Sequence, residues 1–181
     1  IRQTRIEKLK QLRSLGIDPY PDKSFRDTDI GKVISDFNAI EGGQVVIAGR
    51  IFGMRKHGKL AFMDIKDASG KVQVILRQEA LAQANYERGK LKFDDLHLID
   101  ESDFVEVKGT VSKSQSGEIS VDAGYLRLLA KALRPLPEAH EGFKDKEARF
   151  RRRYIDTNIN PEVYARIYNN RGNTYYNLND Y

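Results

Sequence analysis

Two runs of alternating hydrophobic and polar residues, separated by the turn-forming cluster DASG at 67–70, occupy positions 60–76 of the chain. Successive side chains of a β-strand point to opposite faces, so each run presents one apolar face. The small and aliphatic side chains of these two faces are Ala61, Met63, Ile65, Val72, Val74 and Leu76. The pattern predicts a β-hairpin whose apolar face packs in a core.

This arrangement leaves Phe62 and Gln73 together on the outer face of the predicted hairpin. An exposed aromatic ring can stack on a nucleobase, and an exposed amide beside it can hydrogen-bond the edge of that base. The same two side chains would also make a cross-strand pair that only shields the sheet. The hairpin by itself does not distinguish these two interpretations.

Hydrophobic residues at helical spacing predict two helices before the hairpin. Over residues 1–15 they form one narrow stripe, and Gly16 is the residue expected just beyond a helix C-terminus. A second stripe predicts a shorter helix over residues 29–37. Both helices precede the predicted β-structure, so they form an N-terminal helical extension.

The remaining segments complete a recognisable order of elements. A strand is predicted over 44–53, followed by the basic loop GMRKHGK at 53–59 and, after the hairpin, by a partly helical segment over 77–91. Two more strands are predicted over 103–111 and 119–129, the second with an interruption at Gly124. Strand, hairpin, helix and hairpin is the order of an all-β fold, the five-stranded OB-fold barrel, with a helix between strands 3 and 4. This fold binds oligonucleotides on strands 2 and 3, using the loops between strands 1 and 2 and between strands 4 and 5.

Charge adds a second indication of a nucleic acid partner. The net charge of the 181-residue chain is +5 at pH 7, and basic residues gather within 1–15, 55–59 and 149–153. Three separate basic clusters fit a polyanion better than a solvated surface does. The residues expected to contact a nucleic acid backbone are Arg2, Arg5, Lys8, Arg13, Lys56 and Lys59.

Other features of the composition exclude several classes of protein. The chain has no cysteine, which excludes disulfides and thiolate metal sites, and its three histidines are scattered, so no structural metal is expected. No run approaches the roughly 18 apolar residues of a membrane helix, and no signal-peptide pattern opens the chain. We therefore expect a cytoplasmic protein without membrane contact.

The run KALRPLPEAHEGFKDKEARFRRRYIDTNINPE at 131–162 closely resembles the segment that joins the anticodon-binding and catalytic domains of class II lysyl-tRNA synthetases. GIDPYP at 16–21, AGRI at 48–51 and SGEIS at 116–120 resemble the same family in the same order. FRRRYID is shared with the aspartyl and asparaginyl enzymes and identifies only the subclass. KALRPLPE together with GIDPYP favours the lysyl branch.

The resemblance implies roles for five side chains in binding the anticodon stem-loop of tRNA(Lys). Phe62 matches the aromatic residue that sandwiches the central anticodon base, and Gln73 matches the glutamine that reads the edge of that base. Glu118 matches a glutamate that contacts a flanking base, while Arg50 and Arg55 fall where the family contacts the anticodon loop. The assignments of Phe62 and Gln73 agree with the alternation of the strands.

The family's intact enzyme is expected to join lysine to tRNA through a lysyl-adenylate, using ATP and Mg²⁺, as a homodimer. The expected domains here are the helical extension (1–40), the OB-fold anticodon-binding domain (41–135), and a linker with a truncated start of the catalytic domain (136–181). We expect no catalytic residue or cofactor in this chain. Residues 164–181 are rich in Asn and match the family's dimer helix poorly, which favours a monomeric fragment.

Three alternatives remain open on the sequence alone. A free-standing OB module that binds single strands without sequence preference would need the same outer face and basic clusters. A scaffold that binds protein would have a similar surface but little salt dependence. An aspartyl- or asparaginyl-tRNA synthetase relative is the third alternative.

Overall fold

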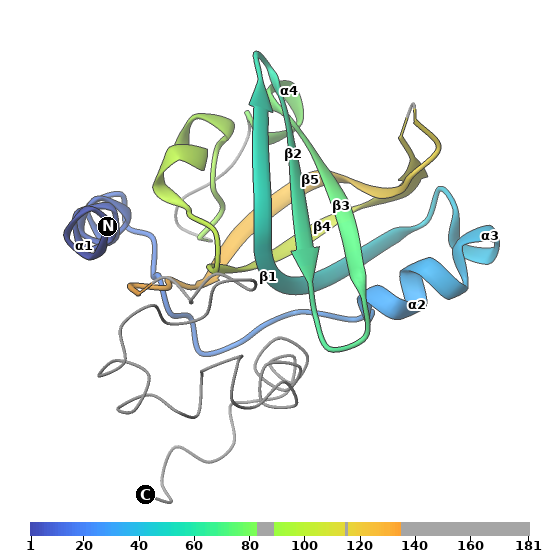
Figure 1. Cartoon of the computed structure of the whole chain (residues 1–181), viewed down its shortest axis with the longest axis horizontal. Helices are drawn as coiled ribbons and strands as arrows, with labels where there is room; N and C mark the ends of the chain where they lie inside the picture. Colours follow the sequence, from blue (N-terminus) through green and yellow to red (C-terminus); the bar gives the residue numbers. More distant parts are fainter. Residues whose placement is uncertain (83–88, 115, 135–181) are drawn as a thin grey trace, which may run out of the picture.

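The computed structural model describes residues 1–82, 89–114 and 116–134 of the chain (Figure 1). The helices are α1 (Arg2–Ser14), α2 (Ile30–Ser35), α3 (Phe37–Ile40), α4 (Gln78–Leu81) and the 3-10 helix η2 (Phe93–Leu98). The strands are β1 (Gln44–His57), β2 (Leu60–Lys66), β3 (Lys71–Arg77), β4 (Phe104–Lys113) and β5 (Ile119–Ala130). The expected linker and tail at 136–181, with the basic cluster 149–153, lie outside the described residues.

The five strands form a closed barrel in the order β1-β2-β3-β5-β4, and pairing of β1 with β4 closes it. Neighbouring strands are antiparallel except for β3 and β5, which are parallel. The predicted five-stranded OB-fold barrel, with an N-terminal helix and a helix (α4) between strands 3 and 4, is confirmed. In Figure 1, β1, β2 and β3 form one wall of the barrel, and β4 and β5 cross at an angle to it.

Alternation along the central hairpin decides which side chains enter the core. All six residues of its predicted apolar face are at most 2% exposed and belong to one hydrophobic cluster. The Met, Ile, Val and Leu side chains of this face each contribute about 1.5–3 kcal/mol when buried, so reversing the face of one strand would be prohibitive. The outer face, with Phe62 and Gln73, is thereby fixed.

Two glycines permit strands to approach closely. A Cβ on Gly49 would lie 2.8 Å from the carbonyl oxygen of Lys66, and one on Gly109 would collide with that of Asp122. The predicted interruption at Gly124 is a β-bulge, because the pairing of β4 with β5 skips that residue. Such bulges increase the bending that a small barrel requires.

The turn between β2 and β3 also fixes a helix that is distant in sequence. The Asp67 carboxylate accepts a hydrogen bond from the Ile30 amide at 3.0 Å, and the Ser69 hydroxyl accepts one from the Gly31 amide at 2.7 Å. These side chains satisfy the first amides of α2, which its own sequence leaves uncapped. The helix expected over 29–37 is thus present, but it stops at Ser35 and is followed by α3.

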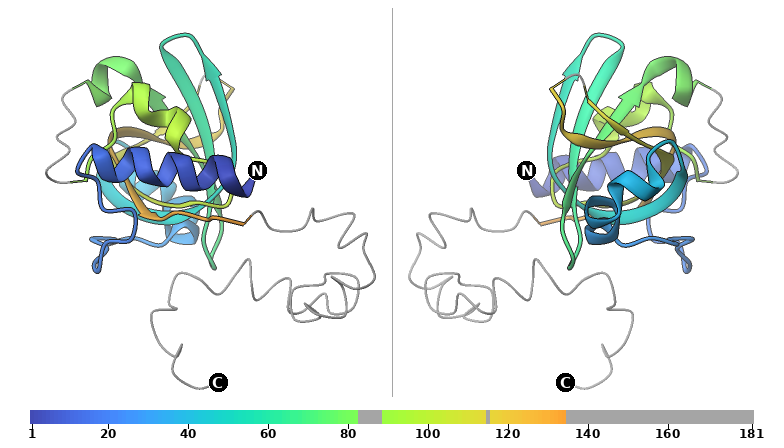
Figure 2. Two further views of the ribbon diagram at one scale, coloured as in Figure 1. Left: turned by 90° about the vertical axis from the view of Figure 1, so that its left-hand side faces the viewer. Right: turned by 90° about the vertical axis from the view of Figure 1, so that its right-hand side faces the viewer.

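Helix α1 ends as its sequence predicts. Gly16 adopts a φ of +76°, and the Ile17 amide donates back to the Leu12 carbonyl oxygen at 3.0 Å, the pattern of a Schellman motif. Leu9 and Leu12 are buried. Figure 2 shows α1 lying along one side of the barrel, with the N-terminus at its free end.

The predicted helical segment 77–91 is helical only over α4 among its described residues, and 83–88 lie outside them. The 3-10 helix η2 that follows was not predicted, since FDDLHL carries no helical stripe. Both elements lie between β3 and β4. Leu81, Phe93 and Leu96 extend the core from this connection.

A buried polar cluster fastens the chain before α2 to the barrel. The Glu106 carboxylate on β4 is wholly buried; it accepts hydrogen bonds from the Ser24 hydroxyl (2.7 Å) and the Phe25 amide (2.6 Å) and pairs with Arg127 at 3.2 Å. Burial raises the pKa of Tyr125, which adjoins Glu106, to about 12. Glu106 occupies an outward-facing position in the alternation of β4, so the sequence did not indicate that its carboxylate would be buried.

Candidate nucleic-acid interface

Phe62 and Gln73 are diagonal neighbours on the outer face of the hairpin. In the strand register Phe62 pairs with Arg55 of β1 and Ile75 of β3, and the next pair on the same face is Asp64 with Gln73. Side chains one register step apart on the same face are within reach of an aromatic ring. The ring and the amide therefore belong to one continuous surface, as the alternation of the strands predicted.

The Phe62 ring is half-buried, with its surroundings favourable to a stacked base. His57 meets it edge-to-face, with ring centroids 6.5 Å apart and planes inclined by 62°. Ile75 beside it is buried, and Arg55 opposite it is exposed. The ring is thus supported by an apolar neighbour and bordered by the exposed cationic side chain of Arg55.

Gln73 is only 6% exposed, so the expectation of an exposed amide was wrong. Its Nε2 donates to the Glu118 carboxylate at 3.0 Å, and its Oε1 accepts from the Ser120 hydroxyl at 3.3 Å. Glu118 itself is exposed at the end of the loop between β4 and β5. The loop therefore brings Glu118 onto the hairpin and covers the amide.

The two arginines expected in the site have different surroundings. Arg50 is buried, its guanidinium lies 4.4 Å from the centroid of the Phe104 ring, and it donates to the Ser102 carbonyl oxygen at 3.5 Å. Arg55 is exposed on the same outer face as Phe62. Within the chain Arg50 packs against β4, whereas Arg55 is accessible to a ligand on Phe62.

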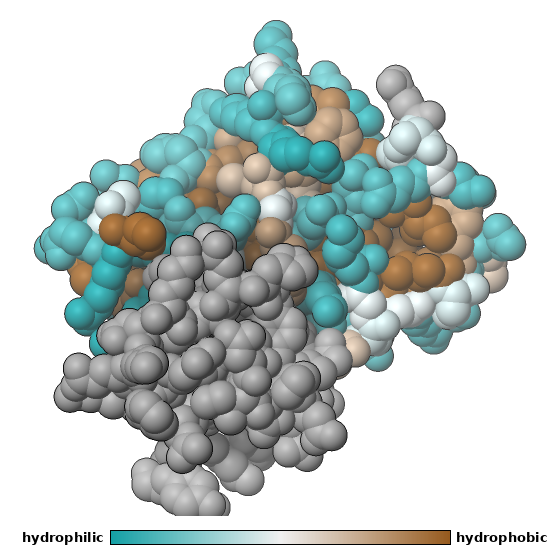
Figure 3. Space-filling view, viewed as in Figure 1, coloured by the Kyte–Doolittle hydropathy of each residue, from teal (hydrophilic) through white to brown (hydrophobic). Residues whose placement is uncertain are grey.

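The loop expected between strands 1 and 2 is mostly part of β1, which continues to His57 and pairs with β2 as far as Leu60. Only Gly58 and Lys59 form the turn, so the expectation of a basic loop over 53–59 was wrong. The pattern was misleading because both faces of this projecting hairpin are polar. Hydrophilic residues cover its tip at the top of Figure 3, where Lys56 and Lys59 are both exposed.

The basic residues of α1 separate into two groups. Arg5 is 8% exposed and donates to the carbonyl oxygens of Ala132 (2.7 Å) and Glu101 (3.0 Å), and Lys8 pairs with Asp100 at 2.6 Å. These two side chains dock α1 on the barrel. The exposed cations of the helix are Arg2, Lys10 and Arg13.

Comparisons with known proteins agree with this geometry. The tRNA anticodon family model, described as an OB-fold nucleic acid binding domain, matches residues 45–129. A lysine–tRNA ligase of Syntrophomonas wolfei is 39% identical over 163 residues, covering 90% of this chain and 32% of the relative. One from Thermoanaerobacter sp. is 41% identical over 160 residues (88% and 31%), and one from Roseiflexus castenholzii is 43% identical over 166 residues (90% and 33%).

The chain is similar to lysine–tRNA ligases over about 90% of its length, and its barrel matches the tRNA anticodon family model. It spans about a third of the length of the curated relatives that it matches. The matched family domain covers all five strands almost completely, and therefore the outer face with Phe62, Gln73 and Glu118.

A buried ion cluster at the end of the barrel was not predicted from the sequence. The Lys131 ammonium, just after β5, contacts Asp100 at 2.5 Å and Asp103 at 2.7 Å, and Asp103 also accepts from the Ala132 amide. Burial raises the pKa of Asp103, although its contact with Lys131 acts to lower it. Burial also acts to raise the pKa of Asp100, but hydrogen bonds from Lys131 and Lys8 hold that pKa below its usual value. No spacing in the sequence links these residues.

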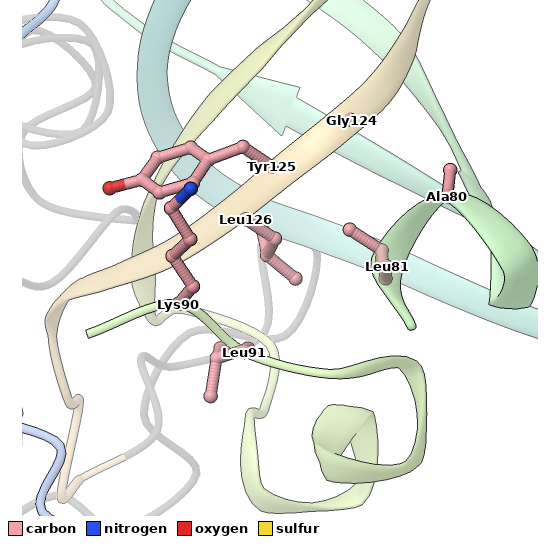
Figure 4. Close-up of a pocket in the computed structure, with 7 residues that line it drawn as sticks. All are labelled: Ala80, Leu81, Lys90, Leu91, Gly124, Tyr125 and Leu126. Carbon is pink, nitrogen blue, oxygen red and sulfur yellow. The ribbon is translucent and has the colours of Figure 1, made fainter. Parts of the chain in front are cut away.

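A cavity of about 190 Å³ lies between α4, β5 and the segment 90–91 (Figure 4). Leu81, Leu91 and Leu126 line it, and the Lys90 ammonium lies 5.0 Å from the centroid of the Tyr125 ring. Ligand pockets are typically about 300–1,000 Å³ and hold convergent polar groups. This cavity is smaller, and Lys90 and Tyr125 are the only lining residues with polar side chains, so we place the candidate site on the outer face of the barrel.

Two further observations concern the described part of the chain. Over residues 1–82, 89–114 and 116–134, no group of three or more His, Asp or Glu side chains has the geometry to hold a metal ion. No helix within those ranges has the length and apolar character needed to cross a membrane.

Proposed function

We propose that this chain binds the anticodon loop of tRNA(Lys) on the outer face formed by β1, β2 and β3. The observation that supports this best is the juxtaposition of the Phe62 ring with Gln73 and Glu118, which come from a hairpin and a loop distant in sequence. The names of the relatives supply the choice of tRNA. An anticodon loop presents unstacked bases, and such bases are what aromatic side chains on a barrel surface recognise.

The three side chains divide the recognition of the central anticodon base, held by Phe62 and Gln73, and of a flanking base, contacted by Glu118. Phe62 stacks on the face of the base, which is worth about 1–3 kcal/mol but tolerates any base. Discrimination comes from the edge: the Gln73 amide both donates and accepts, and the Glu118 carboxylate accepts from a base N–H. Because Gln73 and Glu118 are bonded to each other at 3.0 Å, an incoming uracil edge replaces that bond rather than filling an empty position.

Exposed cations supply affinity without selectivity in this proposal, because phosphate contacts carry no sequence information. Arg55 lies opposite the stacking ring, and Lys59 is exposed at the tip of the projecting hairpin. Lys56 lies on the other face of this hairpin, with its ammonium 4.6 Å from the centroid of the Phe93 ring. The exposed cations of α1 contribute from the side of the barrel. Arg5 receives no phosphate contact, since its guanidinium is committed to two backbone carbonyl oxygens.

Neutralising the exposed cations of α1 by Arg2→Gln, Lys10→Gln and Arg13→Gln should weaken binding of all hairpin RNAs equally. Three lost phosphate contacts would flatten the slope of log K against log salt by up to about 2. Titrations of one hairpin RNA at several salt concentrations measure this slope. Lys32→Gln on α2 serves as a control with a smaller expected effect, and a loss confined to one anticodon would contradict the role given to α1.

The experiment that tests the proposed function compares hairpin RNAs with seven-nucleotide loops centred on UUU with loops in which each uridine is replaced in turn. Tighter binding of the UUU loop is expected, with the largest loss at the central position. Equal affinities would favour a module that binds single strands without sequence preference. Weak binding with little salt dependence would instead favour a protein partner.

For the intact enzyme, we propose the activity that the relatives' names state, attachment of lysine to tRNA. ATP and Mg²⁺ would serve that reaction through a lysyl-adenylate, and the enzyme would be a homodimer. The described residues would contribute the anticodon contacts alone. Lysine-dependent exchange of pyrophosphate into ATP by the 181-residue chain would show that activation also occurs within it.

A further inference from the structure

A β-bulge in β1 places a second aromatic ring on the outer face. The register of β1 with β2 shifts between Ile51, which pairs with Ile65, and Gly53, which pairs with Asp64; Phe52 is the extra residue. A bulge re-aims the side chain that it contains. Phe52 is 36% exposed, which is unusual for a phenylalanine in the middle of a barrel strand.

The position of the Phe52 ring follows from the lysine over it. The Lys66 ammonium lies 5.6 Å from the centroid of that ring. Lys66 follows Phe62 and Asp64 at two-residue intervals along β2, so all three side chains share the outer face. The Phe52 ring is therefore on the same face as Phe62 and the covered amide of Gln73.

The spacing of the two rings suits consecutive nucleotides of one strand. Along β2, Asp64 lies about 7 Å and Lys66 about 13 Å from Phe62. Phe52 lies on the neighbouring strand β1, beside the stretch of β2 between Asp64 and Lys66. Between the rings is Gly53, where an added Cβ would find no atom within 4 Å. The surface between Phe52 and Phe62 is thus open to a ligand that spans it.

The charge beside Phe52 favours an anionic ligand over an apolar one. Lys66 pairs with Lys71 of β3 in the strand register, so a second ammonium group lies one strand beyond the lysine over the ring. Asp64 compensates one of them, because it lies 3.4 Å from the Lys71 ammonium. A ring with a net positive border is the combination that binds a base and the phosphate attached to it.

We propose that Phe52 is a second stacking platform, which holds a nucleotide next to the one on Phe62, with Lys66 and Lys71 facing its phosphate. The proposal rests on the proposed function and extends it to a binding position that the resemblance does not supply. A ring that only shields the sheet would tolerate replacement by an aliphatic side chain. A stacking platform would not.

The test measures binding of the UUU hairpin RNA by Phe52→Ala, Phe52→Leu and Phe52→Tyr variants of the 181-residue chain. About tenfold weaker binding is expected for Ala and Leu, and affinity near that of the unchanged chain for Tyr, which retains a π-face. Phe25→Ala is the matched control, because Phe25 is 64% exposed but stacks on Arg127, away from this face. Thermal unfolding of each variant checks that the barrel is retained.

Abasic nucleotides identify the base that Phe52 holds. Removing the base next to the one on Phe62 should weaken binding of the RNA to the unchanged chain about tenfold, as Phe52→Ala does. The same removal should cause no further loss of affinity in the Phe52→Ala variant. Independent losses at every position, or unchanged binding of Phe52→Leu, would overturn the second platform. If Phe52 fails these tests while the UUU loop is still preferred, only this inference fails; without any loop preference in the unchanged chain, the proposed function itself fails.

Discussion

Phe62→Ala is expected to weaken binding of the UUU hairpin RNA by about 1–3 kcal/mol, roughly 5- to 150-fold in Kd, with the barrel retained. The substitution removes the stacking face but no core atom, since the ring lies on the outer side of β2. Preference for uridine should also decline, because stacking orients the edge of the central base toward Gln73. Titration of the RNA into each protein at fixed salt measures both effects.

Two controls separate this result from an effect on folding. Phe62→Trp keeps a stacking face and should retain most of the affinity. Met63→Ala truncates the core neighbour of Phe62 and should destabilise the barrel by about 2–5 kcal/mol. Unfolding in urea distinguishes the two positions. If Phe62→Ala lost stability as Met63→Ala does, the ring would be part of the core and the proposed site would have no stacking residue.

The sequence was sufficient where local alternation coincided with a buried face. Ala61, Met63 and Ile65 alternate with polar residues, and burying them fixed Phe62 on the other side. The same reasoning located the closing glycine of α1 and the interruption at Gly124. These features depend on chirality and on a period of two or 3.6 residues, both of which can be read within a few positions.

Contacts between segments distant in sequence were beyond such reasoning. Alternation placed Gln73 outward but could not reveal that Glu118, 45 residues later, covers it. The sequence predicts Arg5 as a phosphate contact. It could not reveal that the Arg5 guanidinium donates to the carbonyl oxygens of Glu101 and Ala132, because backbone acceptors have no sequence signature. The bulge at Phe52 was missed for a similar reason: it is defined by the register with β2.

Lys131→Met is expected to lower the free energy of unfolding by about 3–5 kcal/mol, the largest effect that we expect from a single substitution outside the aliphatic core. The Lys131 side chain is wholly buried, and so is that of Asp103, its partner at 2.7 Å. Methionine fills a similar volume but leaves the carboxylates of Asp103 and Asp100 without the ammonium between them. Urea unfolding measures the loss.

Lys8→Met is the matched control, because Lys8 contacts the same Asp100 but both side chains are partly exposed. Its removal should cost at most about 1 kcal/mol. Asp103→Asn added to Lys131→Met should recover part of the larger loss, since a neutral amide removes the unpaired charge. Equal losses for Lys8→Met and Lys131→Met would contradict the importance given to burial.

The pH dependence of the Lys131→Met variant provides an independent check. Burial already raises the pKa of Asp103, and without the Lys131 ammonium the folded-state pKa rises further above the unfolded value of about 3.9. A carboxyl with a raised folded-state pKa stabilises the fold most below its unfolded pKa, and that contribution is lost as pH rises through the folded-state pKa. The deficit of the variant should therefore be smallest in acid and should grow toward neutral pH.

The same cluster connects the stability of the barrel to the basic surface of α1. Lys8 and Arg5 attach α1 to Asp100, Glu101 and Ala132, and two of these residues, Asp100 and Ala132, are held by Lys131 and Asp103. Lys131→Met should thus increase amide hydrogen exchange in α1 before the barrel strands are affected. It should also weaken RNA binding with no change in loop preference, because the outer face around Phe62 keeps its own contacts. Loss of loop preference would mean that the ion cluster also positions the site.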